Sequence, residues 1–334
     1  MTIVIWVDAG PGVGLGHVSR GLALAAALEK RGVRARIALP PDPTAGEWLR
    51  AAGHRNAVVL DPTLAALPQV RDLAADAAAV VVDVRQPLAQ GEVRALGGVT
   101  PVVVIDNDGP GSAEADMVVA LTGGEGPGRL VGPAYVPLRP VAIRPRRRTG
   151  RPTVLVSLGA ADPDGATVRV VDAVAKVDPL PVVRVVANPR TPVWDALAAR
   201  LAALGLPPAR PVTPGGFDAH LAAADLAILA VGVSVYEALA AGVPSIVLAR
   251  SAGDVAHADA LAAHGALVSV GRTWREADLT SAVGTLLADR TRRVAMGKAA
   301  RALVDGRGAE RVAARVVELV VEEGMQHAGR RCRA

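Results

Sequence analysis

The N-terminal stretch that decides the fold reads Thr2-Ile-Val-Ile-Trp-Val-Asp8-Ala-Gly10-Pro-Gly-Val-Gly-Leu-Gly16-His17. Its first residues are apolar and rich in β-branched side chains, which predicts a strand at residues 2–8 that is buried on both faces. A glycine-rich turn follows at 10–16, and an Ala/Leu-rich run at 17–31 predicts a helix. A strand, a glycine turn and a helix in this order begin a βαβ unit of a parallel sheet.

The alternation of short apolar strands and longer helices continues along the chain and restarts once. In the first half, further strands are predicted at residues 35–39, 58–60, 79–82, 102–105 and 117–120. In the second half, strands are predicted at residues 153–157, 182–187, 226–229, 245–247 and 267–270, and helices at 166–177, 193–204 and 308–323. The segment between the halves is dense in Pro, Arg and Gly and has no periodicity, which is typical of a linker.

These patterns predict an α/β chain with two Rossmann-like domains, each built on a parallel sheet. We place the domains and their boundaries as follows: an N-terminal domain at residues 1–143, a linker at 144–152, a C-terminal domain at 153–307, and a C-terminal helix and tail at 308–334. A length of 334 residues favours two domains over one. Ligands bind such sheets at the carboxyl ends of the strands, so we expect the two sheets to face a central cleft.

Composition narrows the classes of function. Apolar residues make up 51% of the chain, enough for folded cores, whereas 2% aromatic residues are too few for base stacking. The basic residues behind the net charge of +5 gather near 144–151 and 330–333, so we expect no nucleic-acid partner. The single cysteine, Cys332, excludes a disulfide framework and indicates a reducing compartment. We expect a cytoplasmic protein without a targeting sequence or an integral membrane segment.

The first candidate site is the glycine-rich turn. Gly14 and Gly16 allow a ligand to approach the backbone closely, and Arg20 lies in the helical turn that follows. No lysine follows the glycines, which argues against a nucleoside triphosphatase. At the start of the helix, His17 offers a neutral imidazole that suits a general base. The alternative is a histidine that only caps or packs the helix.

A second candidate site follows the strand predicted at residues 153–157. Ser157 and Gly159 allow close approach of the backbone to a ligand. Asp162 either contacts that ligand or caps the next helix.

The third candidate site follows the strand predicted at residues 226–229. Gly232, Val233 and Ser234 place backbone N–H groups at the start of a helix, where they can hold a phosphate. Glu237 either accepts both hydroxyls of a ribose or forms a capping box with Ser234.

Together these motifs resemble the GT-B superfamily. The matching segments are Gly14-Leu-Gly-His17-x-x-Arg20, Val104-Ile-Asp106-Asn, Gly132-Pro-Ala-Tyr135-Val-Pro-Leu-Arg139, Ser157-Leu-Gly-Ala-Ala-Asp162, Gly232-Val-Ser-Val-Tyr-Glu237 and Gly242-Val-Pro-Ser-Ile246. Over about residues 3–270 the chain looks like the family of UDP-2,4-diacetamido-2,4,6-trideoxy-β-L-altropyranose hydrolases of the pseudaminic acid pathway. Spore-coat polysaccharide glycosyltransferase-like proteins belong to the same group.

The resemblance implies that the two domains have different roles. The C-terminal domain would bind UDP, with residues 232–234 near the diphosphate and Glu237 at the ribose. His17 would be the general base that activates water against the anomeric carbon of the sugar. The resemblance also implies chemistry without a metal ion, in which helix dipoles and N–H groups stabilise the leaving diphosphate.

Two positions depart from the pattern of that family. Arg85 stands in Val82-Asp83-Val84-Arg85, where the family usually has an Asp-x-Tyr motif. Asp254 and His257 lie near the place of an Asn-Gln pair that contacts the sugar. They are either a substitute acceptor and donor for the sugar or a loop pair without function.

The sequence thus predicts a UDP-sugar hydrolase in which water activated by His17 cleaves the anomeric C–O bond. One alternative is a GT-B glycosyltransferase that moves the sugar from a UDP-sugar to an acceptor. Another is a nucleotide-sugar-binding protein without catalytic activity. The expected partners are a UDP-sugar and, for a transferase, a sugar acceptor. We expect no cofactor and no metal, because no His, Asp and Glu cluster has convincing ligand spacing.

Overall fold

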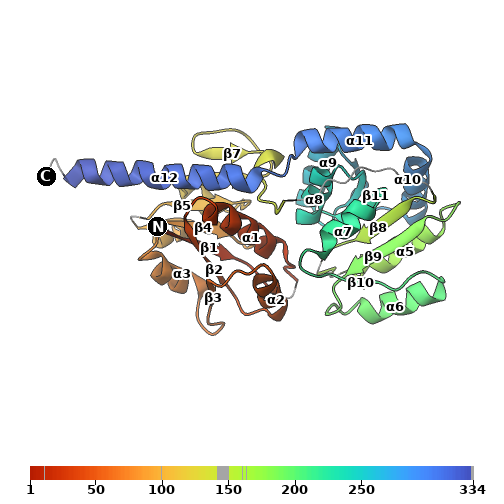
Figure 1. The fold of residues 1–334 in the computed structure, drawn as a ribbon, viewed down its shortest axis with the longest axis horizontal. Coiled ribbons are helices and arrows are strands. Elements are labelled where there is room, and N and C mark those ends of the chain that lie inside the picture. The colour runs from red at the N-terminus through yellow and green to blue at the C-terminus, as the bar shows by residue number, and fades with distance from the viewer. Residues whose placement is uncertain (11, 99, 141–149, 160, 163, 332–334) are drawn as a thin grey trace. The chain divides into compact units, whose positions relative to one another are not determined.

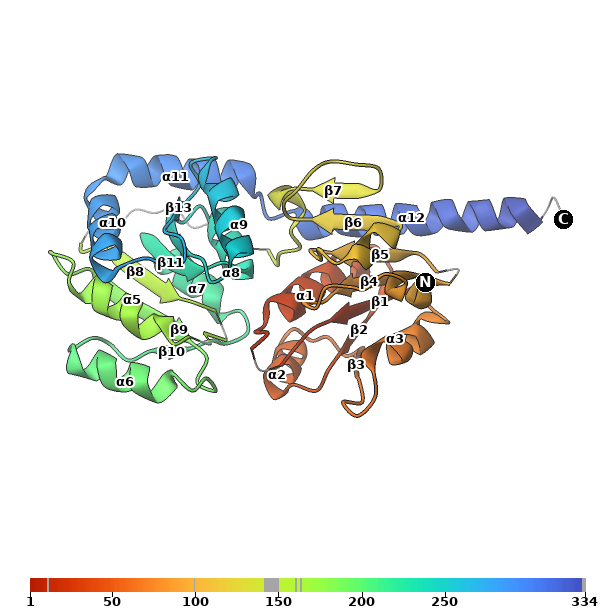
Figure 2. The same cartoon turned by 180° about the vertical axis from the view of Figure 1, so that it is seen from behind.

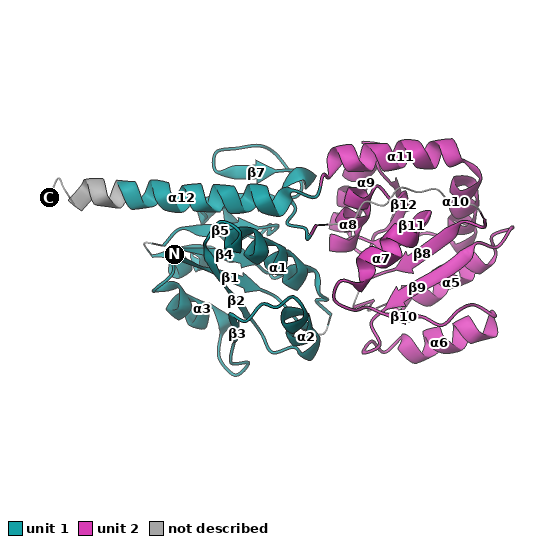
Figure 3. Ribbon diagram, viewed as in Figure 1, with its two compact units in different colours: residues 1–139, 306–334 teal, residues 140–305 magenta. Residues whose placement is uncertain are grey.

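The computed structural model describes residues 1–10, 12–98, 100–140, 150–159, 161–162 and 164–331. The chain forms two compact units (Figure 3). Unit 1 comprises Met1–Arg139 and Gly306–Ala334, and unit 2 comprises Pro140–Asp305. Most of the predicted linker, at residues 144–149, lies outside the described residues.

Unit 1 is a parallel sheet of seven strands in the order β3-β2-β1-β4-β5-β6-β7 (Figure 1). Its strands are β1 (Thr2–Val7), β2 (Arg34–Leu39), β3 (Ala57–Val59), β4 (Ala79–Asp83), β5 (Val102–Ile105), β6 (Met117–Ala120) and β7 (Arg129–Val131). Its helices are α1 (Gly16–Glu29), α2 (Pro43–Ala51), α3 (Ala66–Ala74), α4 (Glu92–Gly97) and α12 (Gly308–Arg331), with 3₁₀ turns at Pro110–Glu114 and Pro133–Tyr135. The central strands β1, β4 and β5 are almost wholly buried, as their continuous Val and Ile runs predict.

Unit 2 repeats the plan with six parallel strands in the order β10-β9-β8-β11-β12-β13 (Figure 2). Its strands are β8 (Thr153–Ser157), β9 (Val182–Ala187), β10 (Arg210–Pro211), β11 (Leu226–Ala230), β12 (Ser245–Leu248) and β13 (Val268–Ser269). Its helices are α5 (Ala166–Ala175), α6 (Trp194–Ala203), α7 (Gly216–Ala223), α8 (Val233–Ala241), α9 (Ala252–Ala262), α10 (Glu276–Ala288) and α11 (Arg290–Leu303). The fully buried Val156, Val170 and Ile228 lie in its core.

Strand order fixes where a ligand is expected in each unit. In an open parallel sheet the crevice lies where the direction of strand progression reverses, at the carboxyl ends of the two strands that flank this switch point. In unit 1 these are β1 and β4, and in unit 2 they are β8 and β11. The glycine-rich turn follows β1, the Gly159 turn follows β8, and Gly232 follows β11. All three candidate turns therefore lie at a switch point.

The C-terminal helix α12 is part of unit 1, whereas the predicted division set residues 308–334 apart from both domains. It packs beside α1, with Val312, Ala313 and Val316 fully buried. Arg311 also donates a hydrogen bond to the carbonyl of Ala134 at 3.0 Å. The sequence predicts a helix at residues 308–323, but local sequence does not reveal which surface that helix covers.

Gly308 begins α12 at a very close approach between two backbone segments. A Cβ atom at this position would lie 2.1 Å from the carbonyl oxygen of Val136. We expect Gly308→Ala to lower the free energy of unfolding by about 1–3 kcal/mol, as other overpacking substitutions do. Urea denaturation measures this loss. The matched control is Gly324→Ala in the same helix, where no atom lies within 4 Å of the new Cβ. Equal stability of the two variants would contradict the prediction.

Several elements were not predicted from the sequence. The strands β7 and β10 are too short to show an apolar period, and α10 and α11 were not singled out. Within the described residues, no helix combines the length and the apolar character needed to cross a membrane.

Candidate functional site

The candidate site of unit 1 is built at the ends of β1 and β4. These two strands pair in parallel, and Val7 of β1 stands opposite Asp83 of β4. Helix α1 begins directly after the glycine turn, so its first residues lie at the same edge of the sheet. His17 and Arg20 are three residues apart and therefore share one face of α1.

Asp83 is the centre of a buried cluster of charged groups. Its Oδ1 lies 2.7 Å from Nδ1 of His17. Arg20 donates to both of its oxygens, from Nε to Oδ2 at 2.8 Å and from Nη2 to Oδ1 at 2.6 Å. The exposed fractions of the side chains are 1% for Asp83, 7% for Arg20 and 14% for His17. A bidentate pair of this kind fixes the carboxylate in the plane of the guanidinium group.

Burial by itself would raise the pKa of the Asp83 carboxyl. The charge of Arg20, together with the hydrogen bond and the charge of His17, outweighs burial, so the pKa lies below its usual value. Asp83 is therefore a carboxylate near neutral pH.

The ionised state of Asp83 determines which nitrogen of His17 carries the proton. A carboxylate oxygen can only accept a hydrogen bond, so at 2.7 Å Nδ1 of His17 must donate. Nη2 of Arg20 is 3.1 Å from the same Nδ1, but two donors cannot bond to each other, so Nη2 is assigned to Asp83. In the neutral imidazole this leaves the lone pair on Nε2. The pair can therefore act as a general base whose orientation Asp83 fixes.

Arg85 connects the end of β4 to the glycine-rich turn. Its side chain donates from Nη1 to the carbonyl of Gly12 at 2.7 Å, and its backbone N–H donates to Oδ2 of Asp8 at 2.7 Å. Arg85 thus holds the turn in place. Gly14 has a φ of 81°, and Gly16 is the first residue of α1.

In unit 2, Ser157 is the buried last residue of β8, and Gly159 follows with a φ of 89°, which favours glycine. Asp162 contacts the start of α5, whose N-cap residue is Gly165. Its carboxylate accepts hydrogen bonds from the N–H groups of Ala166 at 3.0 Å and Thr167 at 3.2 Å.

Helix α8 begins two residues earlier than a capping box of Ser234 and Glu237 would require. Its N-cap is Gly232, which has no side chain to accept a hydrogen bond, and Val233 and Ser234 are already in the first turn. Of the two alternatives for Glu237, the capping box with Ser234 is therefore wrong. Without a side-chain cap, the N–H groups of Val233 and Ser234 are suited to an anionic ligand, whereas the N–H of Val235 donates to the carbonyl of Gly232. Glu237 is buried further along α8, with 8% exposure.

Asp254 and His257 both have structural partners. Asp254 forms a capping box at the start of α9: its N–H donates to Oγ of Ser251 at 3.0 Å, and its Oδ2 accepts from the N–H of Ser251 at 3.2 Å. Nε2 of His257 makes a short hydrogen bond with the hydroxyl of Tyr236, and the two rings pack edge to face. Substrate contact by this pair stays a prediction.

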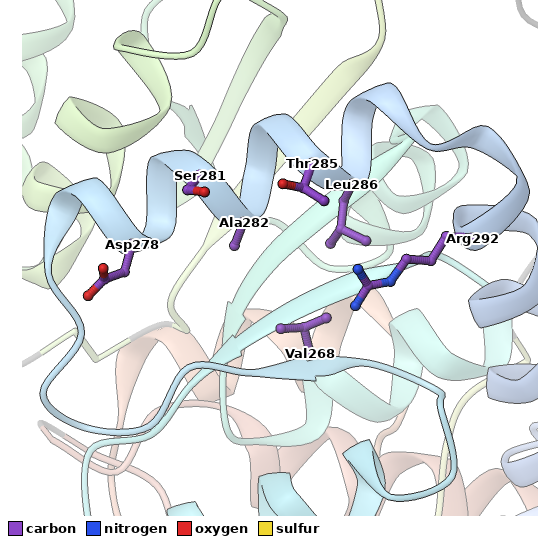
Figure 4. Close-up of a pocket in the computed structure, with 7 residues that line it drawn as sticks. All are labelled: Val268, Asp278, Ser281, Ala282, Thr285, Leu286 and Arg292. Carbon is purple, nitrogen blue, oxygen red and sulfur yellow. The ribbon is translucent and has the colours of Figure 1, made fainter.

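A hollow of about 350 Å³ lies elsewhere in unit 2 (Figure 4). It is lined by α10, by Val268 of β13 and by Arg292 of α11, and it includes none of the predicted site residues. Within the part of the chain that the structure describes, no group of three or more His, Cys, Asp and Glu is placed to hold a metal ion.

Sequence reasoning missed the contact between Asp83 and His17, and it assigned no role to Asp106. In the structure, Nη1 of Arg20 donates a hydrogen bond to Oδ2 of Asp106 at 3.1 Å. A signal was present, because each residue ends or directly follows a predicted strand. Carboxylates at the carboxyl ends of parallel strands gather at one edge of the sheet. The order of the strands was needed to show that they reach α1.

Comparisons with known proteins agree with the fold. No family model matches the sequence. The spore coat polysaccharide biosynthesis protein SpsG of Bacillus subtilis (strain 168) is 35% identical over 102 residues, which cover 30% of this chain and 30% of that protein. The match therefore spans under a third of either protein.

Two solved structures match over nearly the whole chain. MurG of Acinetobacter baumannii has a TM-score of 0.67 at 19% identity, covering 95% of this chain and 100% of that one. The spinosyn rhamnosyltransferase SpnG has a TM-score of 0.64 at 17% identity, covering 93% and 99%. SpnG has also been solved with spinosyn aglycone and with thymidine diphosphate. These matches confirm the predicted fold class: two parallel-sheet α/β units with the GT-B fold.

Proposed function

We propose that this protein is a glycosyltransferase that moves a sugar from a nucleotide sugar to an acceptor hydroxyl. The observation that carries the proposal is the buried pair of His17 and Asp83 at the switch point of unit 1. A histidine oriented by a carboxylate removes a proton from a hydroxyl group, which is the step that glycosyl transfer needs. The whole-chain likeness to a rhamnosyltransferase favours transfer over the hydrolysis predicted from the sequence.

The reaction balances with the groups that the chain supplies. Nε2 of His17 takes the proton of the acceptor hydroxyl, and the acceptor oxygen forms a bond to the anomeric carbon of the sugar. The bond from that carbon to the diphosphate oxygen breaks, and the nucleoside diphosphate leaves with the electron pair. Asp83 stabilises the imidazolium that forms on His17.

Unit 2 is assigned to the nucleotide. The uncapped N–H groups at the start of α8 would hold the diphosphate and stabilise its negative charge as it leaves. Thymidine diphosphate bound to SpnG shows that a protein of this fold takes a nucleoside diphosphate. By the sequence resemblance, the nucleotide of the present chain is UDP.

The test is a panel of UDP-sugars and dTDP-sugars, each incubated with the purified protein with and without hydroxyl-bearing acceptors. We expect one donor to release its nucleoside diphosphate only when an acceptor is present. Release of the nucleoside diphosphate without an acceptor, together with free sugar, would show that water is the nucleophile and that the protein is a hydrolase. Binding of a nucleotide sugar without release of the nucleoside diphosphate under any condition would contradict both the transferase and the hydrolase.

Glu237 offers a separate test of the nucleotide site. If its carboxylate accepts the ribose hydroxyls, Glu237→Gln should weaken UDP binding about 10-fold, the loss of one hydrogen bond to a charged group. Isothermal titration calorimetry with UDP measures the dissociation constant. The matched control is Glu276→Gln in α10, which removes an exposed pair with Lys176 in the same unit. Unchanged affinity in Glu237→Gln would remove Glu237 from the site.

A further inference from the structure

Asp106 has an unusual backbone conformation that no local structural role explains. Among the described residues, only Asp106 and Asp162 have a positive φ without being glycine, at 52° and 32°. The side chain of Asp162 accepts hydrogen bonds from the first N–H groups of α5. Asp106 follows β5 and caps no helix in the described structure. Non-glycine residues held in this region cost stability and gather at functional sites.

The surrounding structure imposes this conformation on Asp106. Its N–H donates to the carbonyl of Val119 in the neighbouring strand at 2.8 Å. The next residue, Asn107, is buried and ties two loops together. Its Oδ1 accepts from the N–H groups of Leu88 and Gly109, and its Nδ2 donates to the carbonyl of Val84. Because its own N–H and the following residue are both anchored, the backbone of Asp106 is held in place before any ligand arrives.

The two oxygens of the Asp106 carboxylate have different surroundings. Oδ2 accepts from Nη1 of Arg20 at 3.1 Å, but Arg20 is already neutralised by the bidentate pair with Asp83. Oδ1 has no hydrogen-bond partner among the described residues, and 35% of the side chain is exposed, against 1% for Asp83. The guanidinium group of Arg20 thus connects a buried carboxylate beside His17 to an accessible one.

We propose that Asp106 is a substrate-contact residue whose Oδ1 accepts a hydrogen bond from a hydroxyl group of the substrate. This inference rests on the proposed function, since it places Asp106 in the site where His17 activates the acceptor. The hydroxyl belongs either to the acceptor or to the sugar of the donor. The unpartnered Oδ1, the exposed side chain and the anchored backbone of Asp106 together suit a contact that orients a substrate hydroxyl beside His17.

The test compares Asp106→Gly and Asp106→Asn with the wild-type protein, using the donor and acceptor that the wild type consumes. Glycine removes the acceptor oxygen but tolerates the positive φ, so the melting temperature should stay within about 3 °C of the wild type. Asparagine tolerates this conformation and keeps one acceptor oxygen. The matched control is Asp108→Gly, an exposed residue of the same loop, which should leave both KM values unchanged.

We expect Asp106→Gly to raise the KM of one substrate about 10-fold or more, with a smaller rise in Asp106→Asn. A higher acceptor KM identifies the acceptor hydroxyl, and a higher donor KM identifies a sugar hydroxyl. A fall in kcat with both KM values unchanged would show that Asp106 only positions Arg20, and wild-type kinetics would show no role. Either result overturns the proposal. Lack of turnover by the wild type itself would instead refute the proposed function, and the role of Asp106 with it.

Discussion

Replacing His17 with alanine should lower the rate of sugar transfer by about two to four orders of magnitude, while UDP binding persists. The expected loss is that of a positioned general base. Binding should survive because the nucleotide is assigned to unit 2, and His17 lies in unit 1. Turnover of the donor identified in the panel measures the first effect, and calorimetry with UDP measures the second.

A second variant separates the loss of the base from damage to the buried cluster. His17→Asn keeps an N–H donor near Asp83 but has no nitrogen that can accept a proton, so it should be as inactive as His17→Ala. His264→Ala, at an exposed histidine outside the proposed site, should keep wild-type activity. If either His17 variant retains more than about a tenth of the wild-type rate, His17 is not the base.

Replacing Asp83 with asparagine should reduce both activity and stability. The amide cannot hold His17 and Arg20 at once as the carboxylate does, so turnover should fall about 10²-fold or more. Breaking a buried ion pair by removing one partner costs about 3 kcal/mol or more. Urea denaturation and turnover measure the two effects. The control is Asp76→Asn, which breaks an exposed pair with Arg36 in the same unit and should change stability by less than about 1 kcal/mol.

The same variant predicts a change in acid stability. Because Arg20 and His17 hold the pKa of Asp83 below its usual value against the effect of burial, the carboxylate stabilises the fold at every pH above its unfolded-state pKa, about 4. This contribution disappears as the pH falls through the folded-state pKa. Stability of the wild type should therefore decrease below about pH 4 more steeply than that of Asp83→Asn. Parallel acid profiles would show that Asp83 is not ionised within the cluster.

The fold was largely predictable because its signals are local. The continuous apolar run at residues 2–8 and the glycine turn after it identified a buried parallel strand, and β1 covers Thr2–Val7. The turns at Gly159 and Gly232 were found for the same reason. The structure corrected the capping-box interpretation, where a cap residue and a glycine turn compete for the start of the same helix. Ser234 and Glu237 match a capping box in sequence, but Gly232 begins the helix. Asp254 forms a capping box in α9 that was not predicted, and its contact with a sugar stays a prediction.

The sequence by itself determined two parallel α/β units and the histidine that a base would require, because apolar period, glycine turns and helix starts depend on neighbouring residues. Only the tertiary structure decided what surrounds that histidine. Asp83 lies 66 residues from His17 along the chain, and it reaches Nδ1 because β4 pairs with β1 rather than with β3. Which strands pair depends on long-range packing, and so do the ionised state of Asp83 and the proton position on His17.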